Sequence, residues 1–363
     1  MRKVNVGIIG CGNISAIYLE NCRKFEQVCV VACADLDFER AVARAKEFNI
    51  PHALTVEELI AHPNIEIVIS LTPPNAHEEI GLQVLEAGKH LYTEKPLATS
   101  FEGGKRVLEK AREKGLLVNA APDTILGAGL QTSRHAIQQG LIGTPTAATA
   151  FLMKSGIENW HPNPEFFYQK GGGPMYDMGP YYLSALIQLL GPIHRVAASA
   201  QMTNIDRFIQ IGKRRGEKIN VQTPTHLSGT LDFKNGAVAT MITSFDVSAT
   251  RLPHIEIYGT EGTLSVPDPN TFGGPVLVKK NGEDEWTELP LISDKTTNLR
   301  GLGVVDMASY LSMGTPQQMS GQLPLHVLEA MHAFHESSLT ESYYKMTTET
   351  IPPTLMQDTG ERV

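Results

Sequence analysis

The first residues whose types and spacing could do chemistry are two glycines near the N-terminus. Gly10 and Gly12 follow the apolar run at residues 4–9, and helical spacing begins at Ile14. A glycine at the first position permits a tight turn, and a glycine at the second lets the backbone approach a diphosphate that the helix N-terminus can hold. Asp35 ends the next apolar run, where its carboxylate could accept hydrogen bonds from ribose hydroxyls. This pattern predicts a dinucleotide site.

The carboxylate of Asp35 also indicates which dinucleotide is bound. It would repel a 2′-phosphate, so we expect NAD as the cofactor and NADP as the weaker ligand. Arg40 lies within the following helical stretch, where a solvated helix face explains it better than a phosphate contact. Ser15 replaces the third glycine of the usual pattern and is still small enough for the helix to pack on the sheet. Three neighbours are further expected cofactor contacts: Asn13, Ile14 and Leu36.

A second polar segment follows the apolar run at residues 65–71. It contains Thr72, Pro73, Asn75 and His77. We expect these residues to border the cofactor, because open α/β sheets bind ligands at the carboxyl ends of their strands. His77 leaves two interpretations open, a hydrogen bond to ribose or a place in the first turn of a helix.

A third polar segment ends the run at residues 89–94. Glu94 is its last residue and Lys95 follows directly. A desolvated lysine at this edge could stabilise a developing alkoxide beside the nicotinamide. The alternative is a surface ion pair between Lys95 and Glu94, which would contribute little. We expect both residues to contact the cofactor, and Lys95 to contact the substrate and act in catalysis.

Composition excludes several classes of partner. The 363 residues include 31 Lys+Arg and 39 Asp+Glu, a net charge of -8, so we expect no nucleic-acid partner. No apolar run approaches the roughly 20 residues that cross a bilayer, so we expect no membrane partner. The four cysteines, all within the first 33 residues, form no CxxC pair; buried free thiols in a reducing cytoplasm explain them better than a zinc site. We therefore predict a cytoplasmic protein without a metal.

The elements that must position these residues fall into two patterns. From residue 3 to about 120, β-branched runs alternate with amphipathic stretches, which is typical of βαβ units around a parallel sheet. Beyond about residue 122, strand-like runs with turn signals, such as Asn235-Gly236 for a two-residue hairpin, predict an antiparallel or mixed sheet with helices on one face. We therefore predict an α/β fold with domains at 1–122 and 123–363. The tail from Thr350 is expected to be irregular.

In combination these residues resemble the Gfo/Idh/MocA oxidoreductases. The resemblance is carried by Asp35 and four segments: GIIGCGNIS, TPPNAH, EKP at 94–96 and GGGPMYDMGPYY at 171–182. It implies an N-terminal Rossmann domain that binds NAD(P) and a C-terminal α/β domain with a large sheet for substrate binding and oligomerisation. It also implies a homodimer or homotetramer that associates through the exposed face of that sheet.

The resemblance also implies a set of catalytic residues. In the family, the lysine of EKP and an Asp-x-x-x-His pair surround the reacting carbon. Here Asp177 is followed four residues later by Tyr181, where most members have histidine. At this spacing the two side chains share one helix face, and Pro180 predicts a helix that begins no earlier than about residue 177. We expect Lys95 to lower the pKa of Tyr181; the alternative is that Asp177 only caps the helix and Tyr181 is a packed aromatic.

Substrate contacts are predicted around the same helix. Trp160, His161 and Tyr168 offer aromatic faces for a sugar ring, although the segment could equally be a packed loop. Asp123 falls near the domain crossover, where many relatives place an arginine that meets substrate. Three C-terminal histidines are predicted to be solvated on a helix face and not to bind a metal: His326, His332 and His335.

The function predicted is hydride transfer between NAD and a secondary hydroxyl or ketone of a sugar, cyclitol or sugar derivative. Tyr181 would exchange the hydroxyl proton, Lys95 would stabilise the alkoxide, and Asp177 would orient the pair. Two alternatives stay open from the sequence: an NAD-dependent glycosidase that uses a transient oxidation, and a non-catalytic regulator that binds dinucleotide.

Overall fold

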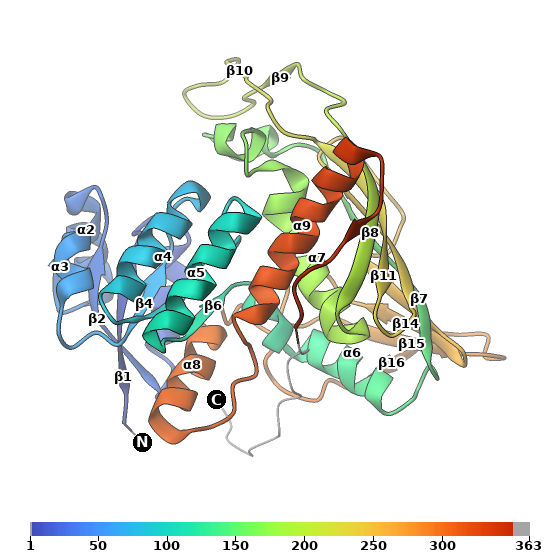
Figure 1. The fold of residues 1–363 in the computed structure, drawn as a ribbon, viewed down its shortest axis with the longest axis horizontal. Coiled ribbons are helices and arrows are strands. Elements are labelled where there is room, and N and C mark those ends of the chain that lie inside the picture. The colour runs from blue at the N-terminus through green and yellow to red at the C-terminus, as the bar shows by residue number, and fades with distance from the viewer. Residues whose placement is uncertain (1, 351–363) are drawn as a thin grey trace.

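The structure is a computed structural model that describes residues 2–350. Its first half is a six-stranded parallel sheet in the order β3-β2-β1-β4-β5-β6, so the strand order reverses beside β1 (Figure 1). Five of its strands match predicted runs, and the three-residue β3 was not predicted. The strands are β1 (Val4–Ile9), β2 (Val28–Ala34), β3 (His52–Leu54), β4 (Ile67–Ser70), β5 (His90–Thr93) and β6 (Val118–Ala120).

Helices cover both faces of this sheet, as the βαβ pattern predicts. They are α1 (Ser15–Cys22), α2 (Phe38–Phe48), α3 (Val56–Ala61), α4 (His77–Glu86) and α5 (Phe101–Lys114). Their ends follow local signals in the sequence. The Thr55 side chain accepts a hydrogen bond from Glu58 N–H in a capping box. The Ser100 side chain accepts from Gly103 N–H at the start of α5, and Gly115 ends α5 with φ +67°.

The second half is a nine-stranded mixed sheet in the order β16-β15-β14-β13-β7-β12-β11-β8-β17. Only β7 and β12 pair in parallel. The strands are β7 (Pro145–Met153), β8 (Ile193–Gln201), β11 (His226–Phe233), β12 (Val238–Ser244), β13 (Ile255–Gly259), β14 (Gly262–Val266), β15 (Val276–Lys280), β16 (Thr287–Leu289) and β17 (Tyr344–Lys345). The predicted hairpin between β11 and β12 is present. Its loop is longer than the two residues predicted, since the Phe233 N–H donates to Ala237 O across it. Gly236 is the residue of this loop with a positive φ, whereas a two-residue turn of this type would need two.

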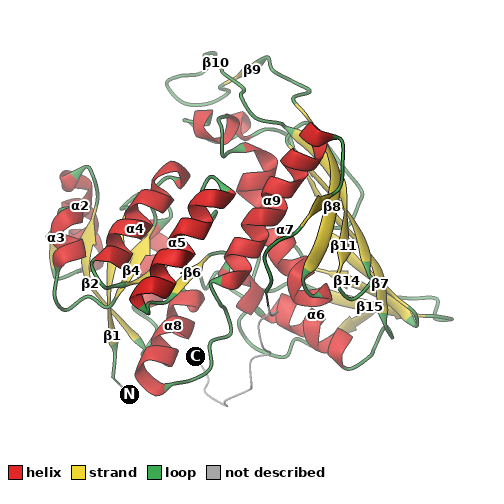
Figure 2. Cartoon of the chain, in the orientation of Figure 1, coloured by secondary structure: helices red, strands yellow, loops and turns green. Residues whose placement is uncertain are grey.

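Helices α6 (Ala128–Gln138), α7 (Gly173–Leu190) and α9 (Gln322–Thr340) lie on one side of the large sheet (Figure 2). The prediction that Pro180 lies in a first turn was wrong, because α7 begins at Gly173 and continues through the proline. A proline inside a helix costs about 3 kcal/mol. Here it is tolerated because almost every residue from Gly179 to Leu190 is buried between the sheet and α9.

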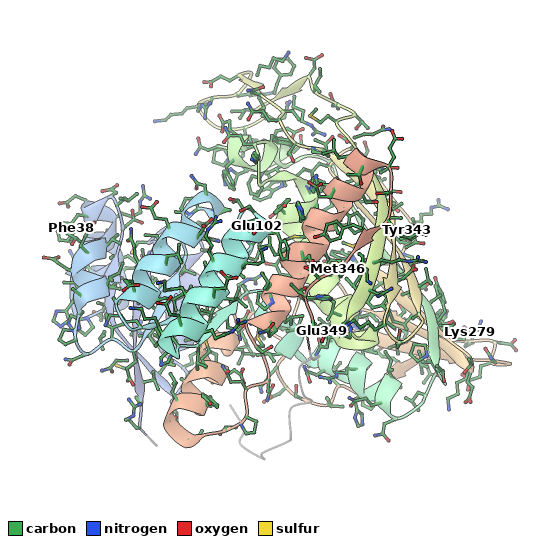
Figure 3. The ribbon with its side chains drawn as sticks, in the orientation of Figure 1. Phe38, Glu102, Lys279, Tyr343, Met346 and Glu349 are labelled. Atoms are coloured by element: carbon green, nitrogen blue, oxygen red, sulfur yellow. The ribbon has the colours of Figure 1, made fainter. Side chains whose placement is uncertain are left out.

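Helix α8 (Leu302–Met313) and the last described segment pack against elements that lie far from them in the sequence. Helix α8 packs against β1 and β2 of the first half. Helix α9 packs against α5 across the boundary between the halves, where Glu102 stands at the start of α5 (Figure 3). Met346 and Glu349 lie along the segment that runs beside α9. The predicted irregular tail lies beyond residue 350 and outside the described residues.

A lobe, defined here as residues 155–170 and 202–224, extends from one end of α7. It contains the short helices η3 (Ile157–Asn159) and η4 (Glu165–Tyr168) and the two-stranded β9 (Arg207–Phe208) and β10 (Lys218–Ile219). Four of its side chains form, together with Phe245 at the end of β12, a hydrophobic cluster separate from the main core; the four are Ile157, Tyr168, Ile209 and Ile219.

Two predictions about single side chains are corrected by the fold. Cys29 is exposed on β2, whereas the other three cysteines are buried as predicted. His326 is fully buried, not solvated, because its ring accepts a hydrogen bond from Ile193 N–H and bonds the Thr348 hydroxyl. Within residues 2–350, no three His, Cys, Asp or Glu side chains form a group that could hold a metal ion. Every helix of this part is too short or too polar to span a bilayer.

Candidate active site

The turn after β1 is shaped for a dinucleotide. Gly10 has φ +100°, and a Cβ there would lie 2.6 Å from Leu71 O, so only glycine fits. A Cβ built on Gly12 would meet no heavy atom within 4 Å. The backbone at Gly12 is therefore open to a ligand that approaches closely, as a diphosphate at the N-terminus of α1 would.

The carboxylate of Asp35 holds this turn in place. One oxygen accepts the Cys11 N–H at 2.8 Å and the other accepts the Asp37 N–H at 3.0 Å. Each oxygen keeps a second lone pair, so the carboxylate can still accept from ribose hydroxyls. Arg40 is half exposed, and its Nη1 lies 3.6 Å from Asp35 Oδ1. It therefore forms an ion pair and is not a purely solvated side chain of the helix face.

Two further residues lie near this turn and the ribose position. Arg44 was not predicted; its guanidinium donates to Gly12 O at 3.2 Å and places a cation beside the diphosphate position. No motif marks it, because the contact depends on how α2 packs beside the turn. Leu36 is 98% exposed, next to the ribose position that Asp35 defines.

His77 has a structural role and does not present a free ring nitrogen. It is 1% exposed, and its two ring nitrogens lie 2.6 Å from Pro96 O and 2.8 Å from Thr72 O. Burial lowers the pKa of His77. The expectation that His77 contacts ribose is therefore corrected: the ring ties the loop after β4 to the loop after β5. Pro73 and Asn75 stay exposed along the edge that would face a cofactor.

Lys95 faces the second half of the chain. Its Nζ donates to Asp177 O at 2.5 Å and to Asp177 Oδ1 at 2.9 Å, and it lies 5.3 Å from the centre of the Tyr181 ring. The alternative of a Lys95–Glu94 surface pair is wrong, because the Glu94 carboxylate accepts instead from the Tyr18 hydroxyl and from the Lys95 N–H. Burial opposes the charge on Lys95, but Asp177, Tyr181 and Glu94 outweigh it and raise its pKa. Lys95 therefore stays an ammonium ion.

Asp177 and Tyr181 share one face of α7, as their spacing predicts. Asp177 lies in the second turn of the helix and is not its cap, so that alternative is wrong. Tyr181 is 5% exposed, and its hydroxyl accepts from Arg300 Nη2 at 3.4 Å. Burial raises the pKa of Tyr181 although Lys95 and Arg300 lower it. The expectation of a net lowering by Lys95 is therefore corrected, and the resting group is a neutral phenol.

Two expected substrate contacts are enclosed in the protein. Asp123 is 1% exposed and accepts hydrogen bonds from Gly301 N–H at 2.7 Å and Gly303 N–H at 3.2 Å. Burial raises its pKa to about 6. Tyr168 is buried in the lobe, where its hydroxyl bonds Glu158 and Arg207. Both predictions are corrected, because neither side chain has a surface to offer a substrate.

The other two predicted substrate residues belong to an exposed aromatic cluster on the lobe. Trp160 is 60% exposed, and the ring of His161 lies against three other rings. The cluster consists of Trp160, His161, Phe166 and Phe167. Their contact with a substrate stays a prediction.

Comparison with known proteins matches both halves of the chain. Residues 4–121 match the model for the oxidoreductase family with an NAD-binding Rossmann fold, and residues 130–265 match the GFO/IDH/MocA C-terminal domain. The chain is similar to 1,5-anhydro-D-fructose reductase of Ensifer adhaerens, 28% identical over 78% of this chain and 82% of that one. It is also similar to myo-inositol 2-dehydrogenase of Thermotoga maritima, 22% identical over 72% of this chain and 74% of that one.

Solved structures share the fold over nearly the whole chain. A levoglucosan dehydrogenase in complex with NADH superposes with a TM-score of 0.80 at 20% identity, over 96% of this chain and all of that one. An NAD binding oxidoreductase from Klebsiella pneumoniae superposes with a TM-score of 0.83 at 22% identity over the same shares. The chain is therefore a member of the Gfo/Idh/MocA oxidoreductase family, with an NAD-binding Rossmann domain at its N-terminus.

Proposed function

We propose that this oxidoreductase transfers a hydride between NAD and a secondary hydroxyl or ketone of a sugar, cyclitol or sugar derivative. The observation that carries the proposal is the convergence of Lys95, Asp177 and Tyr181 beside the carboxyl edge of the parallel sheet. The names of the relatives support the substrate class, because 1,5-anhydro-D-fructose, myo-inositol and levoglucosan are all polyhydroxylated rings.

The protein residues divide the remaining chemistry among them. The bound NAD supplies or accepts the hydride. Lys95, held by Asp177, stabilises the oxygen that becomes an alkoxide, and Tyr181 exchanges a proton with the same oxygen. Because Tyr181 rests as a neutral phenol, it is ready to donate in the direction of ketone reduction. In the direction of oxidation it must first lose its proton.

The cofactor preference is tested by titrating nucleotide-free protein with NADH and, separately, NADPH while following nicotinamide emission. We expect tight NADH and weak NADPH binding, because the oxygens of Asp35 face the ribose position. Preference for NADPH would overturn the role given to Asp35. Failure to bind either nucleotide would overturn the proposed activity altogether.

The catalytic role is tested with Lys95→Met in a screen of sugars and cyclitols. We expect turnover to fall by about 10²–10³-fold in protein that still binds NADH, because the cation acts on the developing alkoxide. Wild-type turnover by Lys95→Met would contradict this mechanism. Release of an aglycone without net NADH formation would favour the glycosidase alternative. The paired Lys95 and Asp177 favour catalysis over a purely regulatory protein.

We further propose that the chain forms a homodimer or homotetramer through the outer face of the large sheet. Small uncharged side chains lie on the part of this face formed by β8, β11 and β12. A shallow groove on it is lined by residues that include Ala197, Ser199, Ser228, Thr230 and Thr240. A flat face of this kind lets two sheets approach closely.

A further inference from the structure

The guanidinium of Arg300 reaches the candidate active site from a loop far along the chain. Its Nη2 donates to the Tyr181 hydroxyl at 3.4 Å and to Asn270 Oδ1 at 3.0 Å, and its Nη1 donates to Asn298 Oδ1 at 2.8 Å. All three acceptors are neutral. Among residues 2–350 no carboxylate forms an ion pair with Arg300, so its charge is not matched by direct contact, whereas that of Lys95 is matched by Asp177.

The backbone around Arg300 is held by two buried side chains, one on α1 and one just after β6. Asn21 on α1 donates to Asn298 O and to Arg300 O, both at 2.9 Å. Asp123 accepts from Gly301 and Gly303 on the other side of Arg300. Both Asn21 and Asp123 are 1% exposed. Because these contacts use only the backbone of the loop, they fix its place without the Arg300 side chain.

We propose that Arg300 is a catalytic residue that stabilises the deprotonated hydroxyl of Tyr181, and that Asn21 and Asp123 are the residues that position it. The inference rests on the proposed function, since it takes Tyr181 as the proton-transfer group. Whichever way the reaction runs, Tyr181 passes through a phenolate. The ammonium group of Lys95 lies over the Tyr181 ring, and the guanidinium group of Arg300 lies at the Tyr181 oxygen. Asp177 contacts Lys95, and the nearby carboxylate of Glu94 accepts from the Tyr18 hydroxyl. Among residues 2–350, Arg300 is thus the cation at the Tyr181 oxygen that no carboxylate contacts, and it opposes the effect of Glu94 on the phenolate.

The direct test replaces Tyr181 by 3,5-difluorotyrosine in the full chain and follows ionisation of the labelled phenol by fluorine NMR. This phenol ionises at lower pH than tyrosine, which brings its titration closer to neutral pH. Arg300→Gln should raise the pKa of the labelled phenol by about one to three pH units, the range for loss of a nearby opposite charge. Arg300→Lys should restore part of the shift. Arg215→Gln, which changes an exposed arginine of the lobe, should leave the pKa unchanged.

The positioning role is tested in the same labelled protein with Asp123→Ala. It should raise the pKa of the phenol in the same direction as Arg300→Gln, because the loop loses its anchor. If Arg300→Gln leaves the pKa where it is in the parent protein, the inference is wrong.

Turnover distinguishes this inference from the proposed function. With an active sugar substrate, Arg300→Gln should lower kcat by about tenfold or more, which is the rate effect of about 1.4 kcal/mol, with NADH affinity unchanged. A shifted pKa with unchanged kcat would overturn the catalytic role of Arg300. Wild-type protein that binds no nicotinamide cofactor would overturn the proposed function, while the pKa shift would still test the Arg300–Tyr181 contact.

Discussion

The charge states around Lys95 follow from which side chains face one another once they leave water. Lys95 stays charged because Asp177 contacts it, and Glu94 is held by the Tyr18 hydroxyl. Tyr181 stays neutral because burial outweighs both neighbouring cations. The site therefore holds a fixed cation beside a proton donor, which is the arrangement that ketone reduction requires.

The two glycines of the dinucleotide turn should respond differently to alanine. Gly10→Ala should lower the free energy of unfolding by about 1–3 kcal/mol, since φ is +100° and the new Cβ meets Leu71 O. Gly12→Ala should leave stability unchanged and weaken NADH binding by about tenfold or more, because its Cβ occupies space that only a ligand fills. Denaturant unfolding and NADH titration of both variants check this. Equal loss of stability in the two would contradict the role given to Gly12.

Asp123 should make stability depend on pH. Burial raises its pKa in the folded chain from 3.8 to about 6, so the folded chain binds this proton more tightly than the unfolded chain does. The stability that this proton provides is full below about pH 4 and is lost as the pH rises through about 6, a loss of about 3 kcal/mol. Asp123→Asn has no ionisable group at this position, so its stability lacks this dependence on pH. Denaturant unfolding of both proteins from pH 4 to pH 7 should show wild type losing stability relative to the variant; parallel curves would contradict the shift.

At the scale of elements, the start of α7 is not set by Pro180, because Pro174 already lies in the first turn of the helix. Gly173 has φ +83°, and a Cβ on Gly172 would lie 2.6 Å from Phe166 O. Because both positions are glycines, the backbone can pass close to η4 and turn into the helix before Asp177. The helix then presents Asp177 and Tyr181 toward Lys95 while its C-terminal turns pack in the core.

The lobe beside α7 is held together by a buried arginine. Arg207, 4% exposed, makes ion pairs with Glu158 and Asp246 and donates to Phe245 O. These contacts join its two segments, residues 155–170 and 202–224, to the end of β12. The guanidinium of Arg207 is therefore a link between the lobe and the large sheet, in addition to the hydrophobic cluster.

Replacing Arg207 should loosen the lobe. Arg207→Met should lower the free energy of unfolding by about 3–5 kcal/mol, because it leaves the buried carboxylate of Glu158 and the partly buried carboxylate of Asp246 without their cation. Limited proteolysis should then cut within residues 202–224. The matched control is Arg214→Met, whose partners Glu165 and Glu217 lie near the surface, with an effect below about 1 kcal/mol. Similar losses in both variants would contradict the importance of burial.

At the scale of the whole molecule, the two halves are interlocked. Helix α8 follows the second sheet in sequence but packs on the first, and a Cβ on Gly303 would lie 2.6 Å from the Tyr92 ring. Helix α9 packs on α5, where Gly104 leaves room for Leu328. The candidate active site takes Lys95 from one half and Asp177 with Tyr181 from the other, so it exists only when the halves are packed together.

The outer face of the large sheet should control assembly. Thr240→Lys places a charge in the middle of that face and should convert a dimer or tetramer to a smaller species, because like charges would meet across the interface. Gln83→Lys, an exposed change on α4, is the matched control. Light scattering after size exclusion measures the mass of each protein. An unchanged mass for Thr240→Lys would rule out this face as the interface.

The sequence by itself determined the features that depend on neighbours along the chain. The five strands of the first sheet other than β3, the caps at Thr55 and Ser100, and the pairing of Asp177 with Tyr181 all follow from local periodicity and spacing. Family resemblance added the assignment of Asp177 and Tyr181, with Lys95, to the surroundings of the reacting carbon. Such features are predictable because short-range geometry is the same in every chain that carries the pattern.

Only the tertiary structure decided the contacts between distant segments. Arg300 meets Tyr181 across 119 positions, and Asp123 meets Gly301 across 178. The enclosure of Tyr168 and the net rise in the pKa of Tyr181 depend on burial in the same way. The physical reason is that burial and long-range contact arise from how the two halves and the lobe pack against one another, and the spacing of residues within one segment carries no record of that packing.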